Sequence, residues 1–134
     1  MKKIIWTNGC FDILHKGHIE LFRYAKSLGD KLIVGIDSDE RVKLDKGEGK
    51  PINNLSDRAI VLQSIKYIDR VIEFDSTDEL KNLIKDIKPD IMVIGSDWKG
   101  KRGVGEEYAG KVEFFDRIKG YSTTKLLKKL NENL

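Results

Sequence analysis

The alternation of short apolar runs with helical patterns constrains the fold of this chain more than any other feature. Five runs are short, rich in β-branched or aromatic residues and bounded by Gly, Asp or Pro: residues 3–6, 31–36, 70–74, 91–94 and 112–115. Most are continuously apolar, which is typical of strands buried on both faces of a parallel sheet. We therefore expect an α/β fold, a doubly wound five-stranded parallel sheet with helices on both faces and right-handed crossovers.

Helical patterns fill the segments between these runs. Residues 17–28 carry an apolar stripe at helical spacing and end before Gly29. Further helices are expected at 57–68, with Ile60, Val61, Ile65 and Ile68 on one side, at 77–87, and from the hydroxyl residues 122–124 to the C-terminus. Residues 43–54 contain two glycines, a proline and three lysines, and predict a mobile loop.

Composition places the chain among globular single-domain proteins. It has 134 residues, 40% of them apolar, and no linker or repeat, so residues 1–134 are expected to form one domain. The net charge of +3 suits binding of a polyanion such as a nucleotide without demanding nucleic acid. The single cysteine excludes an internal disulfide, and no apolar run approaches the ~20 residues of a membrane span. We expect a cytoplasmic protein with no membrane or nucleic-acid partner.

The stretch TNGCFDILHKGH, residues 7–18, follows the first predicted strand, where ligands bind in folds of this class. It holds both histidines of the chain, His15 and His18, with Gly17 between them, where a side chain would block a ligand. If a helix begins near Gly17, both imidazoles can face an anion at its N-terminus. The alternatives are plain packing or a metal pair, but no third ligand lies nearby, so no metal site is expected. No nucleophile elbow surrounds Cys10.

Two motifs carry a family resemblance. The run H-K-G-H at residues 15–18 and the run G-Y-S-T-T-K at residues 120–125 resemble the hallmarks of the cytidylyltransferase-like nucleotidyltransferases, and the resemblance covers essentially the whole chain. It implies a single Rossmann-like domain. It also implies an enzyme that joins a nucleoside triphosphate to a phosphorylated sugar or polyol and releases pyrophosphate.

The attacking phosphate of such a reaction is already ionised at pH 7, so no general base is required and catalysis is mainly positioning and electrostatic stabilisation. The catalytic residues are then expected to be His15 and His18, as hydrogen-bond donors to triphosphate oxygens, with Lys46 and Arg117 directed at the phosphates. For Lys46 the alternative is a solvated loop lysine. Mg²⁺ is expected to bind through the triphosphate and water, without protein ligands.

The resemblance assigns the other candidates to two groups. The nucleotide is expected to contact Thr7, Asn8, Gly9, Phe11, Gly17, Gly95, Asp97, Trp98, Ser122 and Thr123. The acceptor is expected to contact Asp12, Asp37 and Arg58, with Arg58 gripping its phosphate. Alternatives from the residues themselves stay open. Phe11 and Trp98 also suit core packing. Asp12 suits a turn, and Ser122 and Thr123 suit plain helix caps.

Two substrate pairs compete. Four segments resemble the adenylyltransferase domain of ADP-heptose synthases: KGEGKPIN, DRAIVL, FDSTDEL and VGEEYAGKV. This resemblance favours ATP and a heptose 1-phosphate as the substrates. Other segments resemble glycerol-3-phosphate cytidylyltransferases: SIKYIDRVI, GSDWKGK and an arginine three residues before Gly120. In addition, the heptose enzymes usually carry Lys-Gly-Gly-Asp after the fourth strand, where this chain has Ile94-Gly95-Ser96-Asp97. A catalytically silent nucleotide-binding module is the alternative of another class. The resemblance also implies a homodimer, with the interface around the second strand and the following loop. Because no kinase domain accompanies this sequence, we expect a free-standing transferase.

Overall fold

A central parallel sheet organises the protein. The computed structural model describes residues 2–95, 103–116 and 120–134. The sheet has the order β3-β2-β1-β4-β5, and every neighbouring pair of strands is parallel. The order reverses between β1 and β4, which are adjacent in the middle of the sheet. The predicted α/β fold is confirmed, with strands β1 (Ile4–Gly9), β2 (Lys31–Asp37), β3 (Arg70–Phe74), β4 (Ile91–Gly95) and β5 (Lys111–Phe115).

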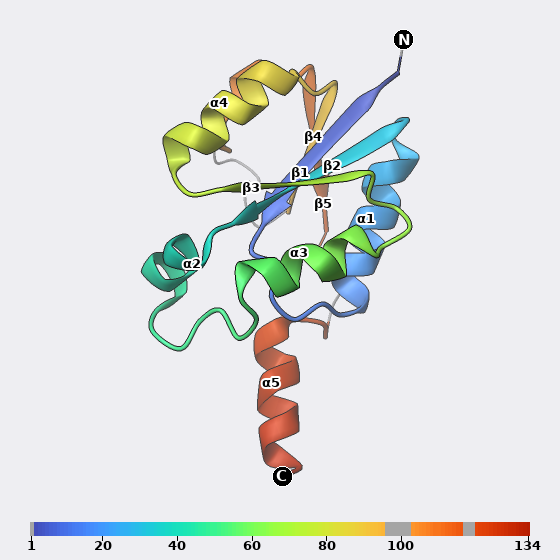
Figure 1. Cartoon of the computed structure of the whole chain (residues 1–134). Coiled ribbons are helices and arrows are strands. Elements are labelled where there is room, and N and C mark those ends of the chain that lie inside the picture. Colours follow the sequence, from blue (N-terminus) through green and yellow to red (C-terminus); the bar gives the residue numbers. More distant parts are fainter. Residues whose placement is uncertain (1, 96–102, 117–119) are drawn as a thin grey trace.

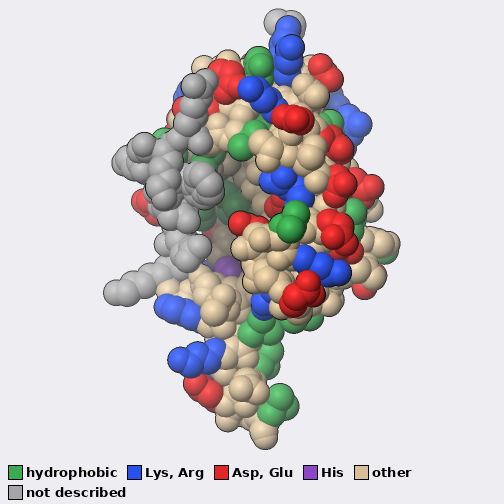
Figure 2. Space-filling view, turned by 90° about the vertical axis from the view of Figure 1, so that its left-hand side faces the viewer, with side chains coloured by type: hydrophobic (Ala, Val, Ile, Leu, Met, Phe, Trp, Pro, Cys, Tyr) green, Lys and Arg blue, Asp and Glu red, His purple; other side chains and the backbone are tan. Residues whose placement is uncertain are grey.

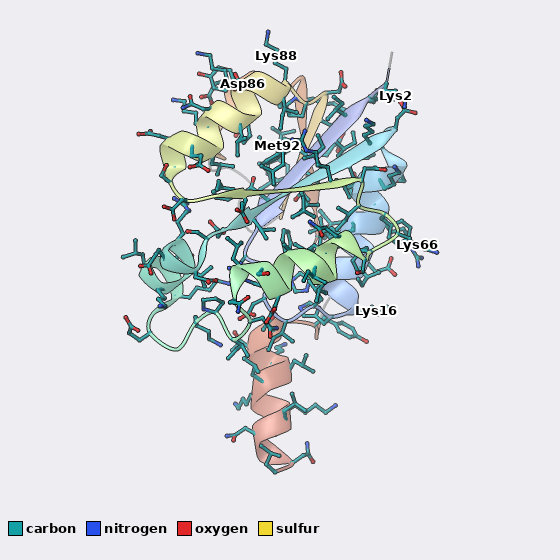
Figure 3. The ribbon with its side chains drawn as sticks, in the orientation of Figure 1. Lys2, Lys16, Lys66, Asp86, Lys88 and Met92 are labelled. Carbon is teal, nitrogen blue, oxygen red and sulfur yellow. The ribbon has the colours of Figure 1, made fainter. Side chains whose placement is uncertain are left out.

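Strand side chains alternate between the two faces of the sheet and build a core on each. Ile5 and Leu32 belong to the core on the face covered by α1 (Lys16–Ser27) and α3 (Leu55–Gln63). The next residues along the same strands, Trp6 and Ile33, pack with α4 (Thr77–Ile87) on the opposite face (Figure 1). Met92 of β4 also lies on the α4 side, in the middle of the sheet (Figure 3). The helices therefore cover both faces, as predicted.

Helix α2 (Asp39–Lys46) occupies part of the segment predicted as a loop. Ser38 caps it, because its hydroxyl accepts a hydrogen bond from the N–H of Arg41. Within α2 only Val42 is buried, so the helix has no apolar stripe for a sequence pattern to detect. The prediction that the loop starts at residue 43 is wrong for residues 43–46.

Helix α3 begins two residues earlier than predicted and turns a different face to the core. Asn54 caps it by accepting a hydrogen bond from the N–H of Asp57. Its buried residues are Arg58 and Leu62, whereas Ile60 and Val61 are 59% and 47% exposed. A buried arginine on the inner face breaks the apolar periodicity, which is why the pattern placed Ile60 and Val61 on the buried side.

The chain ends in α5 (Thr123–Glu132), which projects away from the sheet (Figure 1). None of its residues is buried. Only its first turn lies near the carboxyl ends of the strands, close to the beginning of α1. Across residues 2–95, 103–116 and 120–134, none of the helices has the length and apolar character that a membrane crossing requires.

Candidate active site

Two adjoining cavities lie beyond the carboxyl ends of β1 and β4. The β1–β4 ladder ends at Trp6 and Met92, and a cavity of about 680 Å³ opens beyond it, bounded by the ends of β1, β2 and β4 and by α2. A second cavity of about 370 Å³ lies between the first turns of α1 and α5. Figure 2 shows the hollow, with a histidine in purple at its lower end. Both cavities are lined by Leu21, Lys46 and Gly95.

The two histidines form the N-terminal cap of α1. His15 is the N-cap residue, and its Nδ1 accepts a hydrogen bond of 3.0 Å from the N–H of Gly17. The Nδ1 of His18 accepts a hydrogen bond of 3.2 Å from the N–H of His15. This is the reciprocal pattern of a capping box, with histidines in the two polar positions. It explains why the two side chains are three residues apart.

The cap also determines where each imidazole carries its proton. A neutral imidazole has one acceptor and one donor nitrogen, and in both rings Nδ1 is the acceptor. Each Nε2 therefore carries the N–H. The ring centroids lie 4.0 Å apart, and both histidines line the smaller cavity. The motif thus offers two neighbouring N–H donors beside a helix N-terminus, an arrangement suited to phosphate oxygens.

Gly9 and Gly17 make room for aromatic rings of this chain. A Cβ at Gly17 would lie 2.8 Å from Cε1 of His15, and one at Gly9 would lie 3.1 Å from Cζ of Phe11. Glycine at these positions was expected to clear space for the triphosphate itself. Gly9 lines the larger cavity and Gly17 the smaller one, and the space that a Cβ would take at each also borders a ring, so these glycines allow the rings their positions as well.

Phe11 supports the histidines from the core side. Its ring packs edge-on against His18 at a centroid distance of 5.8 Å and against Phe22 at 5.2 Å. Its backbone φ is +49°, a region that costs free energy for a bulky residue and persists only where the surroundings enforce it. Phe11 is buried in the core and also lines the larger cavity, so it has features of both roles expected for it.

The end of β1 presents polar groups to the larger cavity. Thr7 is buried, and its hydroxyl donates to the carbonyl of Val93 at 3.0 Å, which ties β1 to β4 where their ladder has ended. The Oδ1 of Asn8 accepts a hydrogen bond of 2.9 Å from the Trp6 indole. That bond orients the Asn8 amide. Thr7 and Asn8, both predicted to contact the nucleotide, line this cavity.

The first turn of α5 closes the smaller cavity. Ser122 caps α5 by accepting a hydrogen bond from the N–H of Lys125, and the hydroxyl of Thr123 donates to the carbonyl of Ile13 at 2.9 Å. Tyr121, which the sequence analysis did not select, lies 6.2 Å from the His15 ring between centroids. Its position inside the G-Y-S-T-T-K run was the available signal. Lys16 lies beside it at the start of α1 (Figure 3), with Nζ 5.8 Å from the Tyr121 ring.

Charged side chains of α2 and the end of β2 line the larger cavity. Lys46, at the end of α2, lines both cavities. Asp37 lines the larger one, and its Oδ1 accepts a hydrogen bond of 2.9 Å from Nε of Arg41. Arg41 also donates to the Thr77 hydroxyl at 3.1 Å. Arg41 was missed by the sequence analysis, although its spacing of four residues from Asp37 is that of a helical ion pair.

Asp12 and Arg58, two of the three expected acceptor ligands, line neither cavity. The Asp12 carboxylate accepts hydrogen bonds from the N–H groups of Ile52 and Asn53. The Arg58 guanidinium is fully buried and bonded to groups of the protein. Three further candidates, Asp97, Trp98 and Arg117, lie outside the described residues.

Metal-binding side chains do not gather in the described part of the chain, where no three His, Cys, Asp or Glu side chains are grouped to hold an ion. The smaller cavity offers N–H donors and hydroxyls instead. Such groups bind anions, and a metal carried on phosphate oxygens would leave them unchanged.

The family follows from comparison with known proteins. The model of the cytidylyltransferase-like family matches residues 6–128. The chain belongs to the cytidylyltransferase-like family. The expected family and its Rossmann-like fold are thereby confirmed.

Curated relatives of this cytidylyltransferase-like chain include "Bifunctional protein HldE" from Campylobacter concisus. It is 47% identical over 131 residues, which are 98% of this chain and 28% of the relative. The protein of the same name from a Nitratiruptor species is 48% identical over 129 residues, 96% of this chain and 28% of the relative. The chain therefore spans little more than a quarter of the length of these relatives.

Solved structures agree with this assignment. The lipopolysaccharide core biosynthesis protein from Thermoplasma volcanium GSS1 superposes with a TM-score of 0.70 at 29% identity, covering 91% of this chain and all of that one. A bifunctional NMN adenylyltransferase/ADP ribose pyrophosphatase from Francisella tularensis, solved with AMP and a manganese ion, gives 0.68 at 21% identity. That match covers 100% of this chain and 43% of the other, and it shows a shared fold.

Proposed function

We propose that this chain transfers the adenylyl group of ATP to a heptose 1-phosphate, forming a nucleotide-activated sugar and releasing pyrophosphate. Similarity to the HldE proteins over nearly the whole chain supports this pair, as does the motif resemblance to the adenylyltransferase domain of ADP-heptose synthases. The proposal concerns this one part of those longer proteins.

The observation that carries the proposal is the pair of cavities that meet at Lys46. The smaller cavity has the chemistry of a triphosphate site: two imidazole N–H donors, two helix N-termini and the hydroxyl of Ser122. The larger cavity, with Asp37 and Asn8 in its wall, has groups that bind sugar hydroxyls. An ammonium group at the boundary can contact phosphates from both sides.

The proposed reaction needs no proton transfer from a protein group. A phosphate oxygen of the acceptor attacks the α-phosphorus of ATP, and the bond from that phosphorus to the bridging oxygen of the β-phosphate breaks. Negative charge grows on the phosphate oxygens, where His15, His18 and Lys46 would donate hydrogen bonds. We keep Arg117, Asp97 and Trp98 as proposed contacts to the phosphates and the nucleoside.

Mg²⁺ is part of the proposal as a companion of the triphosphate. When bound, it would neutralise phosphate charge through oxygen ligands of the nucleotide and water. The donor groups of the smaller cavity fit such a complex because they address the phosphate oxygens and leave the ion to its water ligands.

Glycerol-3-phosphate cytidylyltransferase is the second candidate, favoured by the SIKYIDRVI and GSDWKGK segments. Pyrophosphate release measured with ATP or CTP against heptose 1-phosphate or glycerol 3-phosphate separates the two. The proposal predicts turnover with ATP and heptose 1-phosphate at least ~10-fold above every other pair, the size of about 1.4 kcal/mol of discrimination. Turnover confined to CTP and glycerol 3-phosphate would contradict the proposal and assign the second candidate function. Silence of all four pairs would favour the nucleotide-binding module.

We also propose that the protein acts in the cytoplasm as a homodimer, without nucleic-acid or membrane partners. The exposed apolar side chains of Ile60 and Val61 on α3 offer a surface for a second copy, a different place from the interface expected around β2. Sedimentation velocity tests this, since a monomer at micromolar concentration would contradict it.

A further inference from the structure

The Arg58 guanidinium is buried, lines neither cavity and is bonded to the protein through all three of its nitrogens. Its side chain is 0% exposed, and each guanidinium nitrogen donates to the protein. Nη1 donates to the carbonyl of Cys10 at 2.8 Å, Nε to the carbonyl of Asn53 at 3.0 Å, and Nη2 to Oδ1 of Asp39 at 2.7 Å. The planar fork of arginine suits three acceptors in different directions, which a lysine cannot match.

These three acceptors belong to three separate segments around the larger cavity. Cys10 follows β1 and lines the cavity. Asp39 is the first residue of α2, whose last residue, Lys46, lines both cavities. Asn53 lies in the loop before α3. One buried cation therefore joins the loop that leads into the histidine motif to the helix that carries the boundary lysine.

A second set of hydrogen bonds joins two of these segments, and here the loop after β1 supplies the acceptor and the loop before α3 supplies the donors. The Asp12 carboxylate accepts hydrogen bonds from the N–H of Ile52 and, at 2.8 Å, from the N–H of Asn53. Asp12 precedes the N-cap residue His15 by three positions. The loop at 10–14 is thus held by both a cation and a carboxylate, and Thr123 holds it from a third side through Ile13.

We propose that Arg58, paired with Asp39, is a positioning residue that sets α2 and Lys46 against the histidine loop, and that it does not bind the phosphate of the acceptor. The inference rests on the proposed function for its kinetic test. A buried guanidinium needs its charge partner, because an unpaired cation in the interior is strongly unfavourable. Removing the Asp39 charge should therefore disturb the same geometry as changing Arg58.

The kinetic test compares Arg58→Lys, Asp39→Asn and the double variant, with Glu40→Gln as the control. Glu40 is the exposed neighbour of Asp39 on α2. The proposal predicts that each single variant lowers kcat, that KM rises for both substrates, and that the double variant is little worse than either single one. The expected coupling is about tenfold, within the range measured for residues that share one interaction. Glu40→Gln should behave as wild type.

A phosphate-binding arginine predicts a different pattern. Arg58→Lys would raise KM for the acceptor alone, Asp39→Asn would leave the kinetics of the folded enzyme unchanged, and the effects would multiply. Either that pattern or a fall in melting temperature with unchanged kinetics in both variants would overturn the proposal.

Hydrogen exchange supplies a readout that does not depend on turnover. In Asp39→Asn, the proposal predicts faster exchange of backbone amides in residues 10–14, 39–46 and 50–54, while α4, on the opposite face of the sheet, keeps its wild-type rate. If these three segments exchange in Asp39→Asn at the same rates as in wild type, the proposal is contradicted. Because exchange is measured without substrate, failure of the proposed reaction and failure of this inference give different results.

Discussion

Cys10 places a thiol in the lining of the larger cavity. Burial raises the pKa of this thiol above its ordinary value of 9.0, and this effect outweighs the opposing charges of Lys46 and Arg58. The thiolate fraction near neutral pH is therefore smaller than that of a free cysteine. This agrees with the absence of a nucleophile elbow around Cys10 in the sequence.

We predict that Cys10 reacts slowly with a disulfide reagent at pH 8. The rate should be at least several-fold below that of the same chain unfolded in urea, because the unfolded thiol ionises at its ordinary pKa. The single cysteine makes the absorbance change unambiguous. The difference between the reaction rates of the folded and the unfolded chain should shrink as the pH rises through the raised pKa of Cys10. A native chain that reacts as fast as the unfolded one would show that the thiol is neither buried nor shifted.

At the scale of single residues, the sequence pattern located the two histidines but did not indicate the bonding partners of Arg58. His15, Gly17 and His18 lie within four consecutive positions, so a motif could identify them, and the capping geometry agrees with their spacing. Arg58 bonds to two backbone carbonyls and to Asp39, nineteen positions away. Every residue has a carbonyl, so no sequence pattern marks such acceptors.

An ion pair joins helix α1 to Asp69, the residue before β3. Lys26 of α1 donates to Oδ2 of Asp69, which also accepts from the N–H of Leu32 at 2.8 Å. Desolvation raises the pKa of Asp69, but the hydrogen bonds from Lys26 and Leu32 outweigh it, so the pKa lies below its ordinary value of 3.8. A lowered carboxyl pKa stabilises the folded state above the unfolded pKa, and that stabilisation is lost as the pH falls.

We predict that Asp69→Asn melts at a lower temperature than wild type at pH 7, that this gap narrows as the pH falls below about 4, and that it closes once the pH is below the lowered pKa of Asp69. Both proteins are then neutral at this position. Asp86→Asn, at an exposed position on α4, serves as the control and should melt with wild type throughout. A gap that stays constant between pH 7 and pH 3 would mean that the charge of Asp69 contributes nothing.

At the scale of elements, apolar periodicity predicted α1 and α4 well, because both bury an apolar stripe. It missed α2, which buries only Val42, and chose the wrong face of α3, where Arg58 occupies the inner side. Helix α2 lines the larger cavity, whereas α3 reaches its wall only through Arg58, which bonds to Cys10 and to Asp39 of α2. Helices that line a site carry polar residues toward it, so their sequences depart from the pattern on which prediction depends.

At the scale of the whole molecule, the alternation of strands and helices was enough to predict a parallel sheet with a ligand site at its carboxyl edge. Two adjoining cavities at that edge are a property of tertiary structure. They arise because β1 and β4 are neighbours although β2 and β3 lie between them in the chain. The position of Lys46 in the walls of both cavities is visible only once α2 and α5 are placed.

The two histidines have two roles in this account: they cap α1, and they carry the N–H donors proposed for the triphosphate. His15→Asn separates these roles. Asparagine is a good N-cap residue, so this variant should melt near wild type, while the lost imidazole N–H should slow turnover. If His15→Asn is slow and also much less stable than wild type, the loss of turnover comes from the damaged cap of α1 and not from the missing N–H donor.

The central claim is that the Nε2–H groups of the H-K-G-H motif stabilise the triphosphate during transfer. The most direct measurement is the rate of pyrophosphate release by His18→Ala, recorded beside its melting curve. We predict a rate lower by about 10²–10³-fold, the usual cost of removing one donor to developing charge. The fold should stay intact, with a stability loss of about 1 kcal/mol for the broken cap. Near-wild-type turnover in the folded variant would contradict the claim.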